Sequence, residues 1–219
     1  MKYDQLNLML DSIENPELES LLSQYGRSIR LPARRIFSVP GDELDGLIYI
    51  KEGLTRHYMM NDEGTEKLLY QLPKGWFFGE VCCWTGVHTG LYSQADDDVL
   101  LQIISYADAR TLFDTSPCFR NAILKCLIYK TLILRNEVET ITFLSCKKRI
   151  QRLFLAAIDD TVTYEGRWHP LKIQYTHAAL GSIVGASRVT ISKVINEMRG
   201  DQFLRTVNQQ NQIDPTKAG

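Results

Sequence analysis

Short apolar runs, separated by turns that contain glycine, fill the first half of the chain. The runs occupy residues 35–39, 46–50, 54–59, 66–70 and 99–104, and the turns include Pro40-Gly41-Asp42, Glu52-Gly53 and Asn61-Asp62-Glu63-Gly64. Runs of this length bounded by Gly, Pro, Asn and Asp predict β-strands, and several short strands in succession favour an antiparallel roll. A short helix is expected before them, over residues 14–25. We therefore predict an N-terminal antiparallel β-roll, a cupin-like jelly roll, over residues 1–116.

The apolar period changes after Ser116-Pro117. Six residues then follow one another at alternating spacings of three and four, namely Leu124, Leu127, Thr131, Leu134, Val138 and Ile141. This spacing places them on one face of a helix and is typical of a helix pair. We predict a long helix over residues 117–143 whose stripe forms the seam of a homodimer. A helix that packs this face into its own core would show the same pattern, so that alternative stays open.

Two short helical patterns with capping residues follow near the C-terminus. Thr176 can cap the first helix, Gly185 permits a left-handed turn residue, and Ser187 can cap the second helix. The residues expected to face inward are Ala179, Leu180, Ile183, Ile191, Val194 and Ile195. The pattern is typical of a helix-turn-helix, and we predict a C-terminal winged helix-turn-helix domain over residues 144–219. The fold class is then α+β, with the roll, the long dimerisation helix and this domain in that order.

The second of these helices would offer its N-terminal residues to the major groove of double-stranded DNA. Arg188 can bond O6 and N7 of guanine together, and Val189 can contact a thymine methyl group. Ser187, Thr190 and Lys193 are better placed for phosphate. The expected DNA-binding residues are Thr176, Ser187, Arg188, Val189, Thr190 and Lys193. The alternative is an amphipathic helical hairpin with a solvated charged face.

Charge is distributed unevenly along the chain. The formal net charge is -1, yet residues 142–219 carry eleven Lys and Arg against six Asp and Glu. An excess of positive charge favours a polyanionic partner for this end. No run of about 18 apolar residues occurs, and the opening residues 1–5 lack the order of a signal peptide. We expect a cytoplasmic protein without a membrane partner.

The cysteines and histidines do not suggest a metal site. The five cysteines are Cys82, Cys83, Cys118, Cys126 and Cys146. Their number is odd and no C-x-x-C spacing occurs, which fits reduced thiols better than disulfides or structural zinc. We expect Cys82 and Cys83 to be small buried hydrophobes. His57, His169 and His177 are expected at the surface or as caps.

An enzyme is the rival class of function, because a β-roll can also house a catalytic site. The sequence has no Gly-x-Ser-x-Gly elbow, no phosphate loop and no histidine cluster. Glu80, His88 and the acidic run 96–98 lack partners at a telling spacing. We expect no enzymatic activity and no catalytic residue. A ligand-independent interaction module, in which the roll only supports dimerisation, is a third alternative.

Two motifs carry a family resemblance. The segment Ile183-Val184-Gly185-Ala186-Ser187-Arg188-Val189-Thr190-Ile191-Ser192-Lys193 resembles the recognition motif of the cyclic-AMP receptor protein / fumarate-nitrate regulator (CRP/FNR) family. The run Gly75-Trp76-Phe77-Phe78-Gly79-Glu80 looks like part of that family's β-roll, and with the roll's other turns the resemblance covers nearly the whole chain. It implies a ligand-responsive transcription regulator that binds an inverted-repeat operator as a homodimer. An effector would lie between roll and long helix, and RNA polymerase would be a partner if the protein is an activator.

The same resemblance limits which classes of effector are expected. Cyclic-nucleotide members follow Phe-Gly-Glu with an Arg-Ser pair that holds the phosphate, and this chain has Gly90-Leu91 at that place. Iron-sulfur members use cysteines near the N-terminus, whereas the first cysteine here is Cys82. Neither group is therefore expected. Cys83 and His88 fall where haem members ligate iron, so a haem- or thiol-based redox or gas sensor stays open as the alternative.

Within the family, the chain looks most like regulators that sense halogenated phenols, through Tyr70 and Lys130. A lysine can compensate the charge of a phenolate in an apolar pocket, and a tyrosine hydroxyl can orient it. Glu80 stands where those regulators carry a second lysine, which opposes an anion unless Glu80 pairs elsewhere. The alternatives are that Lys130 is a solvated flank of the dimer seam and that Tyr70 packs within a strand.

The expected effector is a small aromatic molecule, and no other cofactor is expected. Trp76, Trp84 and Tyr92 would supply aromatic walls. The expected effector-binding residues are Tyr70, Glu80, Trp84, Leu91, Tyr92, Leu127 and Lys130.

Overall fold

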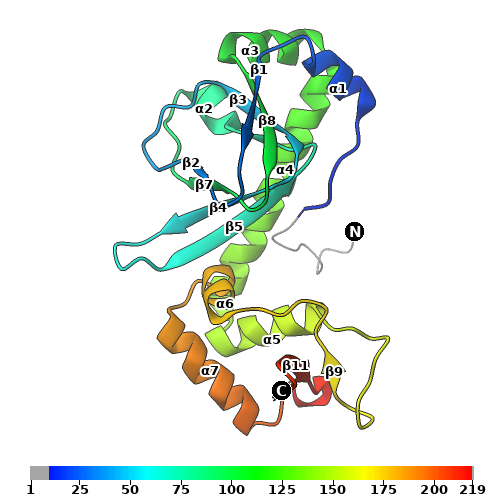
Figure 1. Ribbon diagram of the computed structural model, residues 1–219. Coiled ribbons are helices and arrows are strands. Elements are labelled where there is room, and N and C mark those ends of the chain that lie inside the picture. The colour runs from blue at the N-terminus through cyan, green and yellow to red at the C-terminus, as the bar shows by residue number, and fades with distance from the viewer. Residues whose placement is uncertain (1–9, 219) are drawn as a thin grey trace. The chain divides into compact units, whose positions relative to one another are not determined.

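The computed structural model describes residues 10–218, and Figure 1 shows their helices and strands. Contacts within the chain divide it into two compact units. The first unit joins the chain up to Met59 with Leu68–Asn136. The second unit joins Met60–Lys67 with the chain from Glu137 onward. The opening residues 1–5, on which the signal-peptide prediction rests, lie outside the described residues.

Two four-stranded antiparallel sheets form the roll. Their strand orders are β1-β8-β3-β6 and β2-β7-β4-β5. The strands of the first sheet are β1 (Arg27–Leu31), β8 (Val99–Ile104), β3 (Leu47–Glu52) and β6 (Phe77–Phe78), and those of the second are β2 (Ile36–Ser38), β7 (Tyr92–Ala95), β4 (Leu54–Met60) and β5 (Glu66–Pro73). Apart from β4 and β5, neighbouring strands are not consecutive in the chain. The roll is therefore closed by pairing between distant segments.

Local signals define the helices that accompany the roll, which are α1 (Pro16–Leu22), α2 (Glu80–Thr85), α3 (Tyr106–Thr115) and α4 (Pro117–Phe143). The Asn15 side chain accepts the Leu18 N–H, and Pro16 occupies the first helical position of α1, where its missing N–H costs nothing. The Ser105 side chain caps α3 in the same way. α4 covers 27 residues, the range in which the heptad spacing predicts a long helix.

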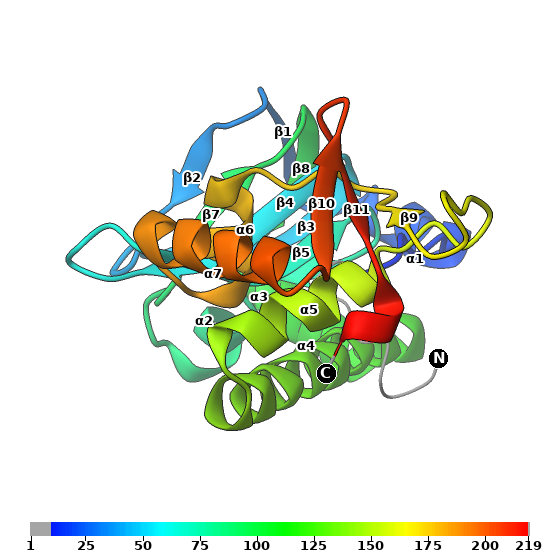
Figure 2. The ribbon, with the colours of Figure 1, turned by 90° about the horizontal axis from the view of Figure 1, so that it is seen from below.

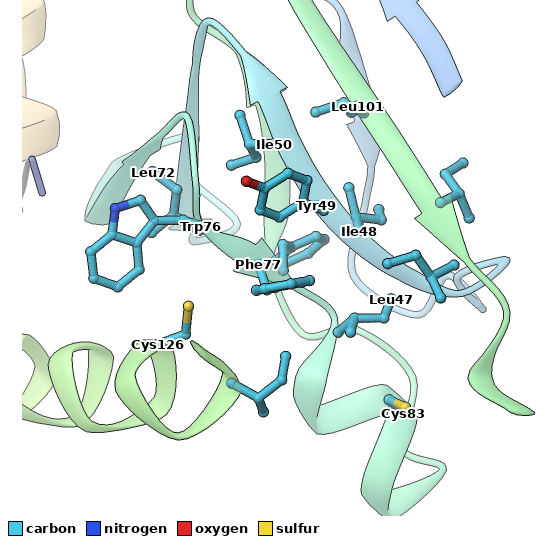
Figure 3. Packing of buried hydrophobic residues seen from close by; sticks show 14 of the residues in the cluster. Leu47, Ile48, Tyr49, Ile50, Leu72, Trp76, Phe77, Cys83, Leu101 and Cys126 are labelled. Atoms are coloured by element: carbon cyan, nitrogen blue, oxygen red, sulfur yellow. The ribbon is translucent and has the colours of Figure 1, made fainter. Parts of the chain in front are cut away.

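Tyr49 on β3 lies at the centre of the roll's core. The stretch from Leu47 to Ile50 is at most 6% exposed, so this strand is covered on both faces instead of alternating between core and solvent. The ring centroids of Tyr49 and Phe77 are 4.9 Å apart, and Figure 3 shows Trp76 on one side of them and Cys126 on α4. Each large side chain buried here stabilises the fold by about 1.5–3 kcal/mol.

The second unit is a three-helix core with a small sheet. Its elements are α5 (Cys146–Ala156), β9 (His169–Pro170), α6 (His177–Val184), α7 (Arg188–Gly200), β10 (Leu204–Val207), β11 (Gln210–Ile213) and the 3-10 turn η2 (Pro215–Lys217). Figure 2 shows β10 and β11 as a hairpin. Asn208 and Gln209 between them have φ values of 49° and 64°, the left-handed pair that a two-residue hairpin turn requires. This hairpin, with β9 beside it, is the wing of a winged helix-turn-helix.

The predicted fold class is confirmed: antiparallel sheets, a long helix and a C-terminal helix-turn-helix domain make a mixed α+β fold. β8 occupies the predicted run 99–104, and the other predicted strands differ from the observed ones at their ends. α1 begins at Pro16 instead of residue 14, because proline can begin a helix but not continue one, and it ends at Leu22 instead of residue 25. β1, β7, α2 and α3 had no counterpart among the predicted elements.

Among the described helices, none is by itself both long and apolar enough to cross a membrane. α6 and α7 reach that length and composition only when they are taken together, and they are bent by 103° at their junction. Both helices contribute apolar side chains to the core of the second unit.

Candidate DNA interface and effector site

Side-chain caps begin both helices of the helix-turn-helix. The Thr176 hydroxyl accepts the Ala179 N–H at 3.1 Å at the start of α6. The Ser187 hydroxyl accepts the Thr190 N–H at 3.3 Å at the start of α7. Each cap satisfies a backbone donor that has no partner inside its own helix, and such a cap is worth about 1 kcal/mol. Both predicted caps are confirmed.

Two glycines make the turn between these helices possible. Gly185 has a φ of 68°, a left-handed conformation that glycine adopts without a steric penalty. A Cβ on Gly181 would lie 2.7 Å from the Ala186 carbonyl oxygen, so this helix position also needs glycine. The turn therefore lets α7 pack against α6 with a bend of 103° between the two helices.

Two basic side chains donate hydrogen bonds to carbonyl groups at the C-terminal end of α6. Arg149 donates to the Val184 oxygen at 2.6 Å, and Lys67 donates to the Ile183 oxygen, also at 2.6 Å. Lys67 also pairs with Glu137 at 2.5 Å, and both side chains are largely buried. Burial lowers the pKa of Lys67, although Glu137 acts in the opposite direction. These contacts, all within the second unit, satisfy carbonyls that the helix leaves open and favour its C-terminal dipole.

α7 has one buried and one exposed face. The buried residues are Ile191, Val194, Ile195 and Met198. Among the predicted inward residues of α6, Leu180 is buried while Ala179 and Ile183 are half-buried. Val184, which was not predicted, is 4% exposed and completes that side of the core.

The structure places the predicted DNA-binding residues together at the start of α7 and α6. Arg188, Val189 and Lys193 are exposed, and Val189 is 65% exposed although it is apolar. The hydroxyls of Ser187 and Thr190 lie 3.0 Å apart and bond to each other. Thr176 is exposed at the N-terminus of α6.

Sequence reasoning missed two further polar residues of this face. The Ser192 hydroxyl lies 3.2 Å from Nδ1 of His177, the first residue of α6. The helical spacing of four residues from Arg188 could have indicated Ser192. His177 is exposed, as predicted, but its bond to the neighbouring helix depends on how α6 and α7 pack.

α4 carries two stripes of residues at alternating spacings of three and four. The buried stripe is Phe119, Ile123, Cys126, Lys130 and Ile133. The predicted seam is Leu124, Leu127, Thr131, Leu134, Val138 and Ile141, all exposed, with Val138 at 65%. Because a separate stripe packs into the core, the alternative that the predicted seam is a core face is wrong.

Lys130 is the charged residue of the buried stripe, at 7% exposure. Its ammonium lies 2.7 and 2.9 Å from the two carboxylate oxygens of Glu80 and donates to the Phe77 carbonyl oxygen at 2.7 Å. It also lies 5.5 Å from the centre of the Tyr70 ring. Burial acts to lower the pKa of Lys130, but Glu80, Tyr70 and Cys126 together raise it. The alternative that Lys130 is a solvated flank is therefore wrong.

The other predicted effector residues have different neighbours. Trp84 packs edge-on against Phe113, with ring centroids 5.2 Å apart, and Tyr92 stacks on Tyr58 at the same distance. Leu91 is half-buried and Leu127 is exposed on α4. Of the predicted set, the structure thus brings Tyr70 and Glu80 together around the ammonium group of Lys130.

His57 is completely buried, so the prediction that it lies at the surface or acts as a cap is wrong. The Thr55 hydroxyl donates to the Leu72 carbonyl oxygen, so it can only accept from Nε2 of His57, 3.0 Å away. Nδ1 must then accept from the Ser93 hydroxyl, also at 3.0 Å. Burial, together with the charge of Lys130, lowers the pKa of His57 well below its ordinary value.

Cys83 and His88, the residues behind the haem or thiol alternative, are each engaged elsewhere. Cys83 is buried, and burial raises the pKa of its thiol. Nδ1 of His88 lies 3.0 Å from the Gly41 carbonyl oxygen. Over residues 10–218, no three His, Cys, Asp or Glu side chains are grouped in a way that could hold a metal ion. As predicted, Cys82 is buried as well.

The wing, the capped helix pair and the exposed basic start of α7 define a DNA-binding helix-turn-helix protein. Comparison with known proteins specifies this class. Residues 148–215 match the Crp-like helix-turn-helix domain. The cAMP-activated global transcriptional regulator CRP of Salmonella typhimurium is 27% identical over 195 residues, which cover 87% of this chain and 90% of that protein. The cAMP-activated global transcriptional regulator Vfr of Pseudomonas aeruginosa is 25% identical over 189 residues, which cover 83% and 86%.

Solved structures share the fold across the chain. The c-di-GMP responsive global regulator CLP of Xanthomonas campestris has a TM-score of 0.75 at 22% identity, covering 90% of this chain and 97% of that one. CprK complexed with OCPA has a TM-score of 0.70 at 20% identity, covering 94% and 95%. Residues 148–215 thus carry a Crp-like helix-turn-helix domain, and over most of its length the chain is similar to DNA-binding transcription regulators of the CRP/FNR family.

The buried His57 makes the roll sensitive to acid. An unfolded histidine takes up a proton near pH 6.5, whereas the folded His57 stays neutral because its pKa is lowered. His57 therefore does not reduce the free energy of unfolding above about pH 6.5. Below that pH the unfolded chain binds a proton that the folded chain does not, and the free energy of unfolding falls by up to about 1.4 kcal/mol per pH unit. Urea unfolding of the wild type and of His57→Gln at several pH values measures this. We expect the free energy of unfolding to fall less steeply with decreasing pH in the variant than in the wild type. The same dependence on pH in both proteins would contradict a neutral buried ring.

The Lys130–Glu80 pair gives a second stability test. Lys130→Met leaves a buried carboxylate without its partner, and we expect a loss of about 3–5 kcal/mol in the free energy of unfolding. Lys130→Met combined with Glu80→Leu removes both charges and should cost clearly less than the single change. Guanidinium unfolding of the wild type, both single variants and the double variant gives the coupling. Additive losses would show that the two side chains do not stabilise each other.

Proposed function

We propose that the protein is a homodimer that binds an inverted-repeat operator and that a small aromatic molecule held in the β-roll controls this binding. The observation that carries the proposal is the exposed start of α7. Arg188 and Lys193 extend from it, and within the described chain neither makes an ion pair that would compete with DNA. An exposed guanidinium, an exposed ammonium and an exposed apolar side chain at a helix start suit base and phosphate recognition.

Each residue of this face has a separate task in the proposal. Arg188 bonds O6 and N7 of a guanine, and Val189 packs against a thymine methyl group. Lys193 contacts phosphate as a point charge. Ser187 and Thr190, whose hydroxyls bond to each other, and Thr176 contact phosphate from the two helix starts.

Dimerisation is assigned to residues 117–143. Exposed apolar side chains on the second stripe of α4 favour a partner helix of the same kind, because large apolar side chains in a regular row are rarely left in water. Two copies of α4 would then present two copies of α7 to half-sites one helical turn of DNA apart, about 34 Å. In this scheme residues 1–116 bind the effector and residues 144–219 bind DNA.

The effector is assigned to the interior of the roll, near Lys130, Glu80 and Tyr70. Arg110, the first arginine after Glu80, donates to the Cys83 carbonyl oxygen at 2.6 Å. The stretch from Glu80 to Arg110 thus offers no uncommitted arginine for a cyclic phosphate. Buried aromatic side chains with an ammonium and a hydroxyl favour a small aromatic ligand instead, with Trp84, Leu91, Tyr92 and Leu127 as further candidate contacts.

DNA affinity and base preference test the roles on α7. We expect Arg188→Ala to cost about 1–3 kcal/mol on the preferred operator and to relax the preference at one base pair. Lys193→Ala should weaken all sequences alike and reduce the dependence of log affinity on log salt by about one phosphate contact. Fluorescence anisotropy with operator and scrambled duplexes at several salt concentrations measures both. Equal losses on every duplex for the two variants would reverse this assignment of roles.

Native mass spectrometry tests the dimer and the effector together. We expect the wild type to have twice the chain mass and to gain mass when a chlorinated phenol is added, but not when cyclic AMP is added. Val138→Asp places a charge in the proposed seam, and we expect it to give monomers. Lys148→Asp, at an exposed position outside the stripe, is the matched control and should leave the dimer intact. A monomeric wild type would exclude the seam, and a mass gain with cyclic AMP alone would exclude the aromatic ligand.

A further inference from the structure

The pair formed by Ser192 and His177 links the two helices of the helix-turn-helix on their exposed side. Ser192 follows Arg188 by four residues and precedes Lys193, so it shares the side of α7 that carries both basic residues. It is half-buried, and its hydroxyl lies 3.2 Å from Nδ1 of His177. Since Ser187 and Thr190 bond to each other, Ser192 is the α7 hydroxyl whose direction depends on α6.

A serine hydroxyl has one proton to donate and two lone pairs to accept with. If Nδ1 of His177 is unprotonated, Ser192 donates its proton to the ring and its oxygen can only accept from a third group. If Nδ1 carries a proton, the ring donates to Ser192, and the serine proton is free for a third group. The state of the ring therefore decides whether Ser192 acts toward its surroundings as an acceptor or as a donor.

We propose that His177 is a positioning residue that sets the donor or acceptor sense of Ser192 and thereby one base preference of the operator. The proposal rests on the proposed function, because it needs α7 in the major groove. At the start of α6, Nε2–H of the neutral ring can donate to a DNA phosphate, which leaves Nδ1 to accept from Ser192. Ser192 then accepts from the amino group of cytosine or adenine. A protonated ring reverses this, and Ser192 donates to O4 of thymine or to guanine.

The surroundings of the pair leave this exchange undisturbed. α6 contains no Asp, Glu, Lys or Arg, and the charged side chains of α7 nearest to Ser192 in the chain are Arg188 and Lys193. Glu197, the acidic residue of α7, pairs with Lys147 at 2.8 Å.

Selection from a randomised inverted repeat, with wild type and Ser192→Ala, locates the base pair that Ser192 reads. At that position, duplexes with 5-methylcytosine and with thymine are compared in one competition. Both pyrimidines carry the methyl group, and the amino and carbonyl groups of the pair exchange places between pyrimidine and purine, because 5-methylcytosine pairs with guanine and thymine with adenine. The comparison therefore reports which of the two groups lies on the pyrimidine side, where Ser192 is expected to contact the pair. The ratio of the two affinities cancels any difference in the amount of folded protein between conditions or variants.

We expect the wild type to prefer 5-methylcytosine by about 3- to 10-fold, which corresponds to one hydrogen bond. His177→Phe and Ser192→Ala should both give ratios near one, and the double variant should add nothing. His169→Phe, a matched change outside α6 and α7, should keep the wild-type ratios.

Two other outcomes overturn the inference in different ways. A ratio in His177→Phe equal to that of the wild type shows that His177 does not set the sense of Ser192, and the proposed function then stands without it. If the wild type enriches no inverted repeat at all, the proposed function fails, and this inference fails with it.

Discussion

Two apolar stripes at the same spacing on one helix are the constraint on which the rest of the fold depends. α4 buries Phe119, Ile123 and Ile133 against the roll, while Leu124, Leu134 and Val138 stay exposed on another side. A rotation of α4 by one residue about its axis would exchange buried and exposed side chains. The hydrophobic effect alone distinguishes such rotations poorly, because each stripe is apolar.

The buried charge on α4 resolves this ambiguity. Lys130 lies in the buried stripe and can be accommodated only where a carboxylate and a carbonyl group meet its ammonium, as Glu80 and Phe77 do. A rotation that turned Lys130 toward solvent would leave the Glu80 carboxylate buried without a partner, at a cost of several kcal/mol. The ion pair thus adds specificity to a contact whose free energy comes mainly from apolar burial. His57, satisfied by Thr55 and Ser93, plays a similar part between strands β4 and β7.

Features that depend on neighbouring residues could be read from the sequence, and features that depend on distant ones could not. The caps at Thr176 and Ser187, the turn at Gly185 and the heptad stripe all involve residues within one or two helical turns. The burial of Lys130 and His57 depends on partners on other elements, and a single lysine in an amphipathic helix gives no sign of them. β1 and β7 were not predicted for a related reason, since their polar residues form strands only through pairing with β8 and β4.

The same ion pair constrains how a ligand could act in the proposed function. An anionic aromatic molecule that binds Lys130 has to take the ammonium from Glu80, since the two carboxylate oxygens already lie at 2.7 and 2.9 Å from it. That exchange would release α2, which begins at Glu80, from its tie to α4. A neutral ligand would leave the tie in place. A ligand that competes with Glu80 therefore has the differential interaction that a change in the position of α4 requires, whereas one that only fills space near Tyr70 does not.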